Sequence, residues 1–426
     1  MELLFLIAIL LVFLALGVPV AFSLLSASLL TFVVMDIPLV VAFQRMSAGM
    51  SIFTLMAIPF FIFAGDLMYR AGIAKKLVSV AEAMFGRPRG GLGLVSVGAS
   101  TLFGAVSGSA VASASAMGST LIPLMKEKKY DGDYAVNVIV SSSVVGLLIP
   151  PSHNMLIYAA AAGTGVSIGD LFLAGIIPGI LTAGLLMVVA WLVAVKRGYA
   201  KGTFPGWRAF LTAFVVAIPG IFTAVIIMGG ILSGIFTATE SSAIAVIYTI
   251  FIGFFVYRSL GWKSFVETAK QSVKITAMVL LIIGAATSFG YALAILEGPT
   301  KLAALITSAT DNPLLVLLIV NVILLVLGTF MDMSPLIVIT TPIFLPIVMQ
   351  MGMDPVHFGV VMMLNLGIGL ITPPVGSALF VGAAVGKIPV EEAVRTIWPF
   401  YGTLIIALLL ITYLPQLSMT LPNFFH

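Results

Sequence analysis

The stretches IPPSHNMLIYAAAAG (149–163) and TPPVGSALFVGAAVG (372–386) decide the fold of this chain. A shift of 223 residues places the first on the second, and it also places Ser109 on Asp332. Residues outside the two stretches fall into the same register without a gap, namely Pro123 on Pro346, Asp131 on Asp354 and Gly146 on Gly369. The chain therefore contains an internal repeat, and each copy carries a Pro-Pro pair within an apolar segment.

Each Pro-Pro pair is expected to break a helix. Proline has no backbone N–H and collides with the preceding turn, so carbonyls near Gly146 to Ile149 and near Gly369 to Thr372 lose their helical donors. Helices that restart at Ser152 and at Val375 would present free N–H groups and a positive dipole end. One break can thus offer oxygens to a cation and N–H groups to an anion, although a kink made only for packing is the alternative.

The composition indicates an integral membrane protein. Of the 426 residues, 61% are hydrophobic and 8% are charged, whereas a soluble domain carries about a quarter charged residues. Soluble enzymes, nucleic-acid binders and disordered scaffolds are excluded, because only lipid can solvate such a surface. The chain has no cysteine and three scattered histidines, which speaks against a transition-metal site: His153, His357 and His426.

The basic residues set the expected orientation. Eighteen of the 20 lie in five connections, which should be cytoplasmic: Arg70–Arg89, Lys126–Lys129, Lys196–Arg208, Arg258–Lys274 and Lys387–Arg395. Arg45 and Lys301 lie in connections of the other side, together with Asp36, Glu297, Asp311 and Asp354. Met1 is followed by an apolar run without a basic region, so the first segment is expected to stay as a transmembrane helix. The pattern predicts ten crossings, two hairpins and both termini outside the cytoplasm.

The segments 91–125 and 314–352 each leave and return to one side of the membrane. Their centres, GAVSGSAVASAS (104–115) and GTFMDMSP (328–335), hold small and polar residues and, in Asp332, a charge. Two full crossings are the alternative, but hairpins are favoured because about 17 residues per arm leave little for an external loop. A non-helical tip at membrane depth must be buried in protein or line a wet cavity.

The ends of the first hairpin are predicted to be cytoplasmic and those of the second extracytoplasmic, so the two copies are expected to be inverted across the bilayer. Inverted repeats with broken helices are typical of secondary transporters, whose sites lie near the midplane. The fold class is therefore an all-α membrane protein built on an inverted repeat. The expected parts are scaffold helices 1–90, a first transport half 91–178 (hairpin 91–125, broken helix 134–165), a connecting helix and scaffold helices 179–274, a helix and outer loop 275–313, a second transport half 314–399 (hairpin 314–352, broken helix 356–386) and a C-terminal helix 400–426.

Asp332 is the strongest single candidate, because an ionisable group at membrane depth costs at least ~2.5 kcal/mol and by default marks a site. Its alternative is a cap on the second arm of the hairpin. At the other tip, Ser107 and Ser109 are expected to be ligands. Ser113, Ser115 and Ser119 in the same run are expected to pack helices closely.

For three further polar residues, the sequence allows two roles each. Glu240 is either a helix-start carboxylate or part of a gate. His153 and Asn154 follow the first break, and they either line a site or are hydrogen-bonded for structure alone.

Seven motifs, in this order and spacing, resemble the large membrane subunit (DctM type) of the tripartite ATP-independent periplasmic (TRAP) transporters: GVPVAF (17–22), IPFFIFAGDLM (58–68), GAVSGSAVA (104–112), IPPS (149–152), TATESSA (237–243), GTFMDMSP (328–335) and ITPPVG (371–376). The resemblance covers essentially the whole chain. It implies an elevator-type fold, in which a transport domain with both hairpins and both broken helices moves against a scaffold. It also implies sodium coupling, a periplasmic substrate-binding protein and a small four-helix membrane subunit, here a separate polypeptide, in a bacterial inner membrane.

The resemblance implies one sodium ion between each hairpin tip and a break. The first would lie among Ser107, Gly108, Ser109, Gly146, Pro150 and Ser152. The second would lie among Asp332, Ser334, Gly369, Thr372, Pro373 and Gly376. The substrate would contact Ser109, Asn154 and Ser377. No cofactor other than Na⁺ is expected.

The expected function is sodium-driven import of an organic acid, either a sialic acid or a C4-dicarboxylate, and not enzymatic catalysis. A stand-alone sodium/dicarboxylate symporter is the first alternative, and it would need no binding protein. A channel or a membrane enzyme is the second. The sequence shows neither a ring-forming filter nor a convergent catalytic set.

Overall fold

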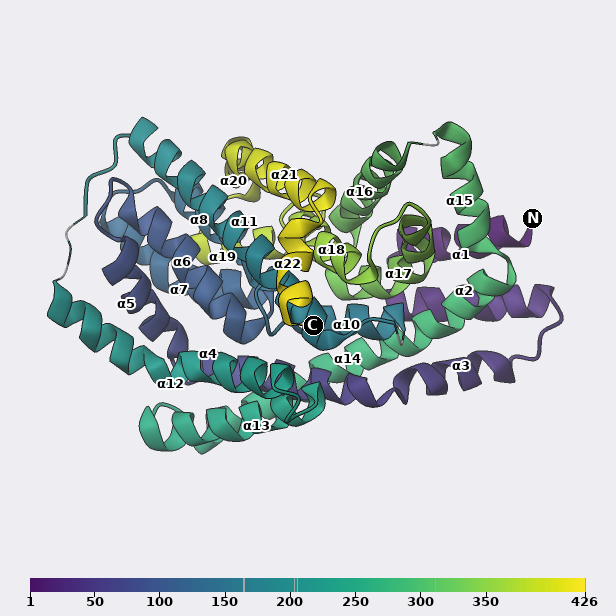
Figure 1. Ribbon diagram of the computed structural model, residues 1–426, viewed down its shortest axis with the longest axis horizontal. Coiled ribbons are helices and arrows are strands. Elements are labelled where there is room, and N and C mark those ends of the chain that lie inside the picture. The colour runs from purple at the N-terminus through teal and green to yellow at the C-terminus, as the bar shows by residue number, and fades with distance from the viewer. Residues whose placement is uncertain (164, 203, 205, 311, 426) are drawn as a thin grey trace.

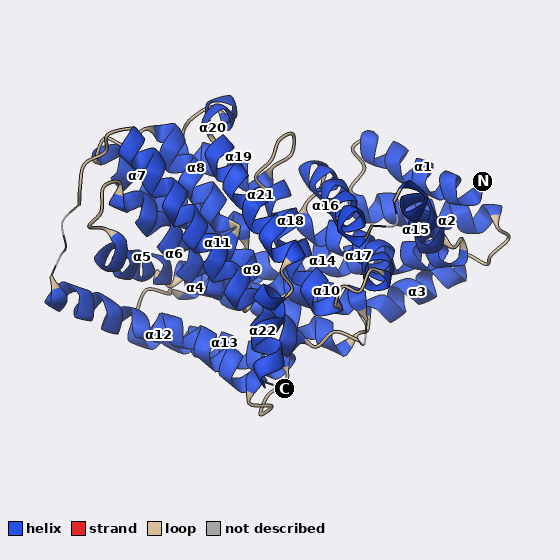
Figure 2. Ribbon diagram, turned by 45° about the horizontal axis from the view of Figure 1, so that its top comes forward, coloured by secondary structure: helices blue, strands red, loops and turns tan. Residues whose placement is uncertain are grey.

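The computed structural model describes the chain except for residues 164, 203, 205, 311 and 426. The described part is helical, apart from turns, loops and an isolated β-bridge between Arg89 and Lys201. Figure 1 and Figure 2 show the helices of the two repeat copies beside one another, with α12, α13 and α14 along one side of the molecule. The all-helical fold class is confirmed.

The N-terminal region contains α1 (Glu2–Ala15), α2 (Val20–Val34), α3 (Val40–Met50), a 3-10 turn (Phe53–Met56), α4 (Ala57–Arg70) and α5 (Ile73–Phe85). The region between the copies contains α11 (Ile168–Lys196), α12 (Trp207–Leu232), α13 (Ala238–Phe251) with a π-helical end (Ile252–Val256), α14 (Trp262–Ile295) and α15 (Gly298–Ala309). Helix α14 packs against α2, α3 and α4, so this region and the N-terminal region form one continuous wall.

The first copy begins with two helices, α6 (Gly91–Ser107) and α7 (Ala110–Glu127), which are joined by a tip of two residues. Its broken helix follows as α8 (Gly132–Ser143), α9 (Val145–Leu148) and α10 (His153–Ala162), with a bend of 48° at the break. The side chain of Ser109 accepts a hydrogen bond from Ala112 N (3.3 Å) and caps α7. The polar tip therefore begins the second arm, as a short polar residue before a helix does.

The second copy has the same order of elements: α16 (Pro313–Phe330) and α17 (Met333–Gln350) form the hairpin, and α18 (Pro355–Gly369) and α19 (Ser377–Gly386) form the broken helix. It is followed by α20 (Val390–Thr396), α21 (Trp398–Tyr413) and α22 (Gln416–Phe425). The predicted helix–tip–helix and helix–break–helix pattern is thus present in both copies.

Within each copy, the hairpin and the broken helix are in backbone contact at a pair of glycines. A Cβ on Gly104 would lie 2.2 Å from Gly146 Cα, and a Cβ on Gly369 would lie 2.6 Å from the Cα of Gly328. Each pair joins the first arm of a hairpin to the end of the helix before the break. Only glycine permits such an approach, because any side chain would separate the two helices.

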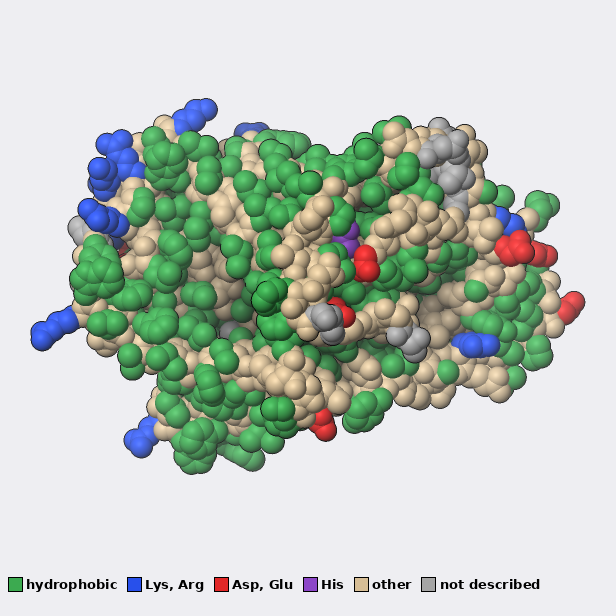
Figure 3. All heavy atoms as spheres, in the orientation of Figure 1, with side chains coloured by type: hydrophobic (Ala, Val, Ile, Leu, Met, Phe, Trp, Pro, Cys, Tyr) green, Lys and Arg blue, Asp and Glu red, His purple; other side chains and the backbone are tan. Residues whose placement is uncertain are grey.

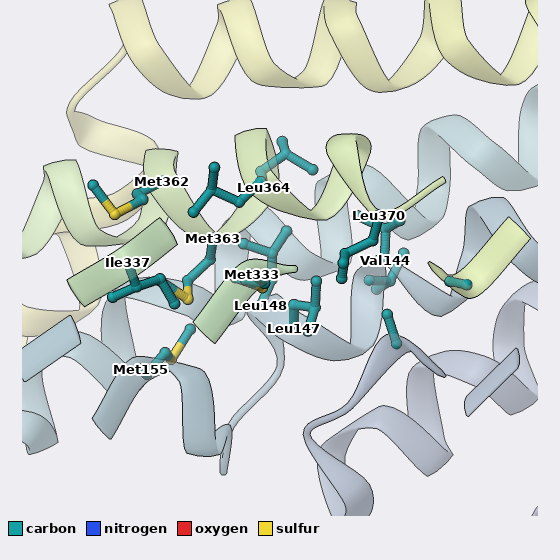
Figure 4. Close-up of a cluster of buried hydrophobic side chains, with 14 of the residues drawn as sticks. Val144, Leu147, Leu148, Met155, Met333, Ile337, Met362, Met363, Leu364 and Leu370 are labelled. Carbon is teal, nitrogen blue, oxygen red and sulfur yellow. The ribbon is translucent and has the colours of Figure 1, made fainter. Parts of the chain in front are cut away.

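The core lies where the two copies meet. Figure 4 shows Leu147 and Leu148 beside the break of the first copy, close to Met333 and Met363 of the second copy. All four side chains are buried. Helices α7 and α19 also pack together, as do α10 and α17, so each copy contacts the broken helix of the other.

The predicted helix restarts need one correction. Helix α10 starts at His153 with Ser152 as its N-cap, as expected, but α19 starts at Ser377 and not at Val375. The reason is that Val375 N donates to Thr329 O (3.0 Å) on the neighbouring hairpin. The chain therefore turns more widely after this Pro-Pro pair than after the first.

Three predicted boundaries also differ from the structure. The boundary at 178 falls inside α11, the expected outer loop contains the helix α15, and the C-terminal segment is two helices. The break before α22 follows from Pro415, which has no N–H to continue α21. Helix α22 then folds back against α11 and α18 and ends near the middle of the molecule (Figure 1).

Among the described residues, seven helices are long and apolar enough to cross a membrane, or up to nine if two bent pairs each count as one span. The count of ten crossings and two hairpins therefore stays a prediction. Figure 3 shows most visible lysine and arginine side chains at one end of the molecule, around α5 and the start of α12. The acidic side chains in this view lie between the centre and the opposite end. The membrane orientation of the chain stays a prediction.

The glycine crossing gives a stability prediction. Gly369→Ala places a methyl group against the backbone of Gly328, so we expect a loss of about 1–3 kcal/mol from overpacking. Gly184 on α11 has nothing within 4 Å of its Cβ position, and Gly184→Ala should be neutral or stabilise its helix by up to ~1 kcal/mol. Thermal unfolding of the purified variants in detergent measures both. Equal midpoints for the two variants would contradict the crossing.

Candidate functional site

A cavity of about 760 Å³ lies between the helical wall and the two hairpin tips. The wall contributes residues from Pro19–Phe22, from α4 and from α14. Opposite them lie the first tip, the start of α10 and the second tip. The polar side chains that line it are Asp66, Tyr69, Ser107, Ser109, Ser115, His153, Asp332 and Ser334. The two tips, which lie more than 200 residues apart in sequence, thus reach one cavity.

The first tip rests on the first break. A Cβ on Gly108, whose φ is +60°, would lie 2.9 Å from both Pro151 O and Ser152 Cα. The prolines at 150 and 151 provide no N–H for the carbonyls one turn earlier, at Gly146 and Leu147. The predicted residues of the first half-site are therefore in contact or adjacent.

Two hydroxyls at this contact lack partners. Ser107 Oγ and Ser152 Oγ are buried and have no hydrogen-bond partner among the residues that the structure describes. Leaving a buried polar group unsatisfied costs about 1–3 kcal/mol. A bound group that completes their coordination would remove this cost, so the contact between tip and break has the chemistry of a ligand site.

The second tip presents a carboxylate. Asp332 occupies the N-cap position of α17, but its side chain does not cap that helix; its Oδ1 accepts from Ser377 Oγ across the second break (3.3 Å). The residue is exposed to the cavity. Ser334 Oγ donates to Asn154 Oδ1 (3.2 Å), which joins the second tip to α10 of the first copy.

The carbonyls of the second break have more partners than the Pro-Pro pattern suggests. Gly369 O accepts from Thr372 N, and Leu370 O accepts from Ala378 N, both at 3.0 Å. Ile371 O accepts from the Tyr401 hydroxyl at 2.5 Å. The prediction that carbonyls between Gly369 and Thr372 are left free is therefore wrong for these three. The Asp332 carboxylate is thus the charged oxygen donor that the second tip presents to the cavity.

The predicted substrate contacts divide into two groups. Ser109 lines the cavity. Asn154 is buried and Ser377 is half-buried, and they bind Ser334 and Asp332 rather than facing the open space. In this structure Asn154 and Ser377 therefore position the second tip.

The positions of Glu240 and His153 distinguish between the two roles that the sequence allowed for each. Glu240 forms a capping box with Thr237 and accepts from Thr237 N at 2.8 Å, so it is a helix-start carboxylate outside the cavity. His153 lines the cavity. Ser115 also lines it, although its run of small residues predicted packing only.

Asp66 is a cavity residue that the sequence reasoning missed. It lies on α4, lines the cavity, and accepts a hydrogen bond from Ser272 of α14 at 3.1 Å. The next residue back, Gly65, packs on the first tip, since its Cβ would lie 3.3 Å from Ser107 Cα. The sequence could have indicated it. An acidic residue within the apolar run 58–68 meets the criterion that selected Asp332, an ionisable group at membrane depth.

The sequence of the chain matches the DctM component of the tripartite ATP-independent periplasmic transporters over residues 7–417. The chain belongs to this family. The predicted family resemblance is confirmed, and members of the family are transporter permeases rather than enzymes.

Relatives of this DctM-family chain carry different substrate names. It is 40% identical over 364 residues to the C4-dicarboxylate TRAP transporter large permease protein of Pseudomonas aeruginosa, which covers 85% of both chains. It is 40% identical over 366 residues to the sialic acid TRAP transporter large permease protein of Vibrio cholerae, which covers 86% of this chain and 85% of that one. The solved YdaH transporter of Alcanivorax borkumensis shares the fold, with a TM-score of 0.63, 14% identity and 87% of each chain covered.

The position of Ser109 in this DctM-family chain can be tested by labelling, because the natural sequence has no cysteine. Ser109→Cys should react with a membrane-impermeant maleimide, because Ser109 lines the cavity. Ser113→Cys, one turn further along α7, should react far more slowly because Ser113 is fully buried. Mass spectrometry of the intact protein measures both rates. Equal labelling would contradict the assigned cavity wall.

Proposed function

We propose that this chain is the large membrane subunit of a sodium-coupled importer of an organic acid. The observation that carries the proposal is the pair of unpartnered hydroxyls, Ser107 and Ser152, at the contact between a hairpin tip and a helix break. Hard cations take oxygen ligands in proteins. Hydroxyl and carbonyl oxygens at the first contact, and the Asp332 carboxylate at the second, supply such ligands on both sides of one cavity.

Bound sodium would also balance the negative charge of the cavity. Its described lining contains two carboxylates, Asp66 and Asp332, and neither lysine nor arginine. An organic acid would meet net negative charge there unless cations were bound. The starts of α7, α10 and α17 reach the cavity, and helix N-termini favour anions. Bound sodium together with these helix ends would make the site neutral or positive.

The substrate class stays open between a sialic acid and a C4-dicarboxylate. Both are organic acids, and a cavity of about 760 Å³ is within the range of small-molecule sites. Relatives named for each substrate are equally identical to this chain. The choice is therefore expected to depend on individual cavity residues and on the binding protein.

The transport cycle is proposed to be of the elevator type. The cavity lies between a wall of α2, α4 and α14 and the two hairpins, which is where a moving domain would slide on a scaffold. Substrate would be delivered by a periplasmic binding protein, and a small four-helix membrane subunit would complete the complex. We place the complex in the bacterial inner membrane, with both termini of this chain in the periplasm.

Asp332→Asn tests the second half-site. The variant keeps the shape but loses the charge that offsets a bound cation, so sodium-driven uptake should fall at least about tenfold and its sodium dependence should weaken. Asp36→Asn is the matched control, because Asp36 lies in the turn between α2 and α3 with φ +55°, a conformation that Asn accepts. The assay is uptake of succinate or N-acetylneuraminate into proteoliposomes that hold the whole complex. Normal sodium dependence in Asp332→Asn would refute the site, and uptake without any binding protein would favour a stand-alone symporter.

Ser152→Ala tests the first half-site through stability. Without sodium the variant should be as stable as the wild type or slightly more stable, because it removes an unpaired buried hydroxyl. Added sodium should raise the melting temperature of the wild type more than that of the variant, since a ligand stabilises by RT ln(1 + [L]/Kd). Thermal unfolding in matched sodium and potassium buffers measures this. An equal sodium effect in both proteins would rule out Ser152 as a ligand.

A further inference from the structure

Two kinds of side chain in the described cavity lining can donate a hydrogen bond to an acid, the hydroxyls and one imidazole. Among the described residues that line the cavity, the polar side chains are hydroxyls, two carboxylates and one imidazole. Carboxylates repel an acid when they are ionised. His153 is thus the lining residue whose side chain contains nitrogen, in the part of the cavity that the structure describes.

His153 is held in place by the architecture of the first break. It is the first residue of α10, and its backbone N would lie 3.2 Å from a Cβ on Gly108 of the hairpin tip. The ring is half-buried, and no hydrogen bond to it is found among the described residues. His357, in contrast, is fully buried with its Nε2 2.8 Å from Ile411 O. Of these two histidines, His153 has a free ring at the cavity.

Only one copy of the repeat has a side chain at the position of His153. The register partner of His153 is Gly376, which has φ +29° and whose Cβ would lie 3.0 Å from Thr372 O. A side chain there would be strained and crowded. The two breaks therefore present different surfaces to a substrate, a ring N–H at the first and bare backbone at the second.

We propose that His153 is a substrate-binding residue that determines which end of the organic acid faces the first break. Its ring N–H donates to an acid oxygen of the substrate, beside the N-terminus of α10. A neutral imidazole always carries one N–H donor, so either tautomer that points this hydrogen at the substrate suffices. This proposal rests on the proposed function and adds the residue that recognises the acid group.

Transport kinetics give the first test. The variants are His153→Leu, which removes the donor, and His153→Gln, which keeps an N–H. The control is Asp36→Asn, in the turn between α2 and α3 and outside the cavity lining. Uptake of succinate and of N-acetylneuraminate is measured in proteoliposomes with the complete complex and saturating sodium. For the acid that the wild type transports, His153→Leu should raise KM about tenfold or more. His153→Gln should recover most of this loss, and Asp36→Asn should stay within about twofold of the wild type.

Direct observation of the ring in the wild type gives the second test, and a variant serves only to assign the signal. The chain has three histidines, so ¹⁵N-histidine labelling gives few imidazole signals, and the spectrum of His153→Gln identifies that of His153. Added acid should shift this signal in sodium buffer and leave the His357 signal unchanged.

The outcomes separate the two proposals. A wild type that takes up neither acid in sodium overturns the proposed function, and this inference falls with it. A wild type that transports an acid, with an unchanged KM in His153→Leu or an unshifted His153 signal, overturns the role of His153 alone.

Discussion

Backbone contact between hairpin and broken helix is the constraint on which the rest of the structure depends. Gly104 meets Gly146, and Gly328 meets Gly369, at distances that admit no side chain. These contacts bring each hairpin tip to the neighbouring break, which places polar groups from distant parts of the chain at one cavity. The unpartnered hydroxyls of Ser107 and Ser152 lie where the first tip meets the first break.

Much of this arrangement could be predicted from the sequence, because it follows from strong local rules. Pro-Pro pairs remove N–H groups wherever they occur, and Asp332 is conspicuous in an apolar segment. The repeat then placed Ser109 and Asp332 at equivalent tips, and the structure brings both to the cavity. The sodium ions, the membrane orientation and the domain division remain predictions.

The features that could not be predicted depend on partners far away in the chain. Tyr401 binds the carbonyl of Ile371, and Thr329 binds the N–H of Val375, so the second break is more fully hydrogen-bonded than its proline pair suggests. No local pattern contains that information. Asp66 differs from these residues, because its place within an apolar run could have identified it as a site candidate from the sequence alone.

The hydrogen bond from Ser334 to Asn154 has a consequence for cooperativity. It links the tip of one copy to the helix that starts at the break of the other, so a displacement of the second hairpin acts on the first half-site. If sodium binds at both half-sites, as proposed, this link would couple them, and binding at either one would change the affinity of the other by the same factor. In the proposed two-ion cycle, the two copies would then respond to sodium as one cooperative unit.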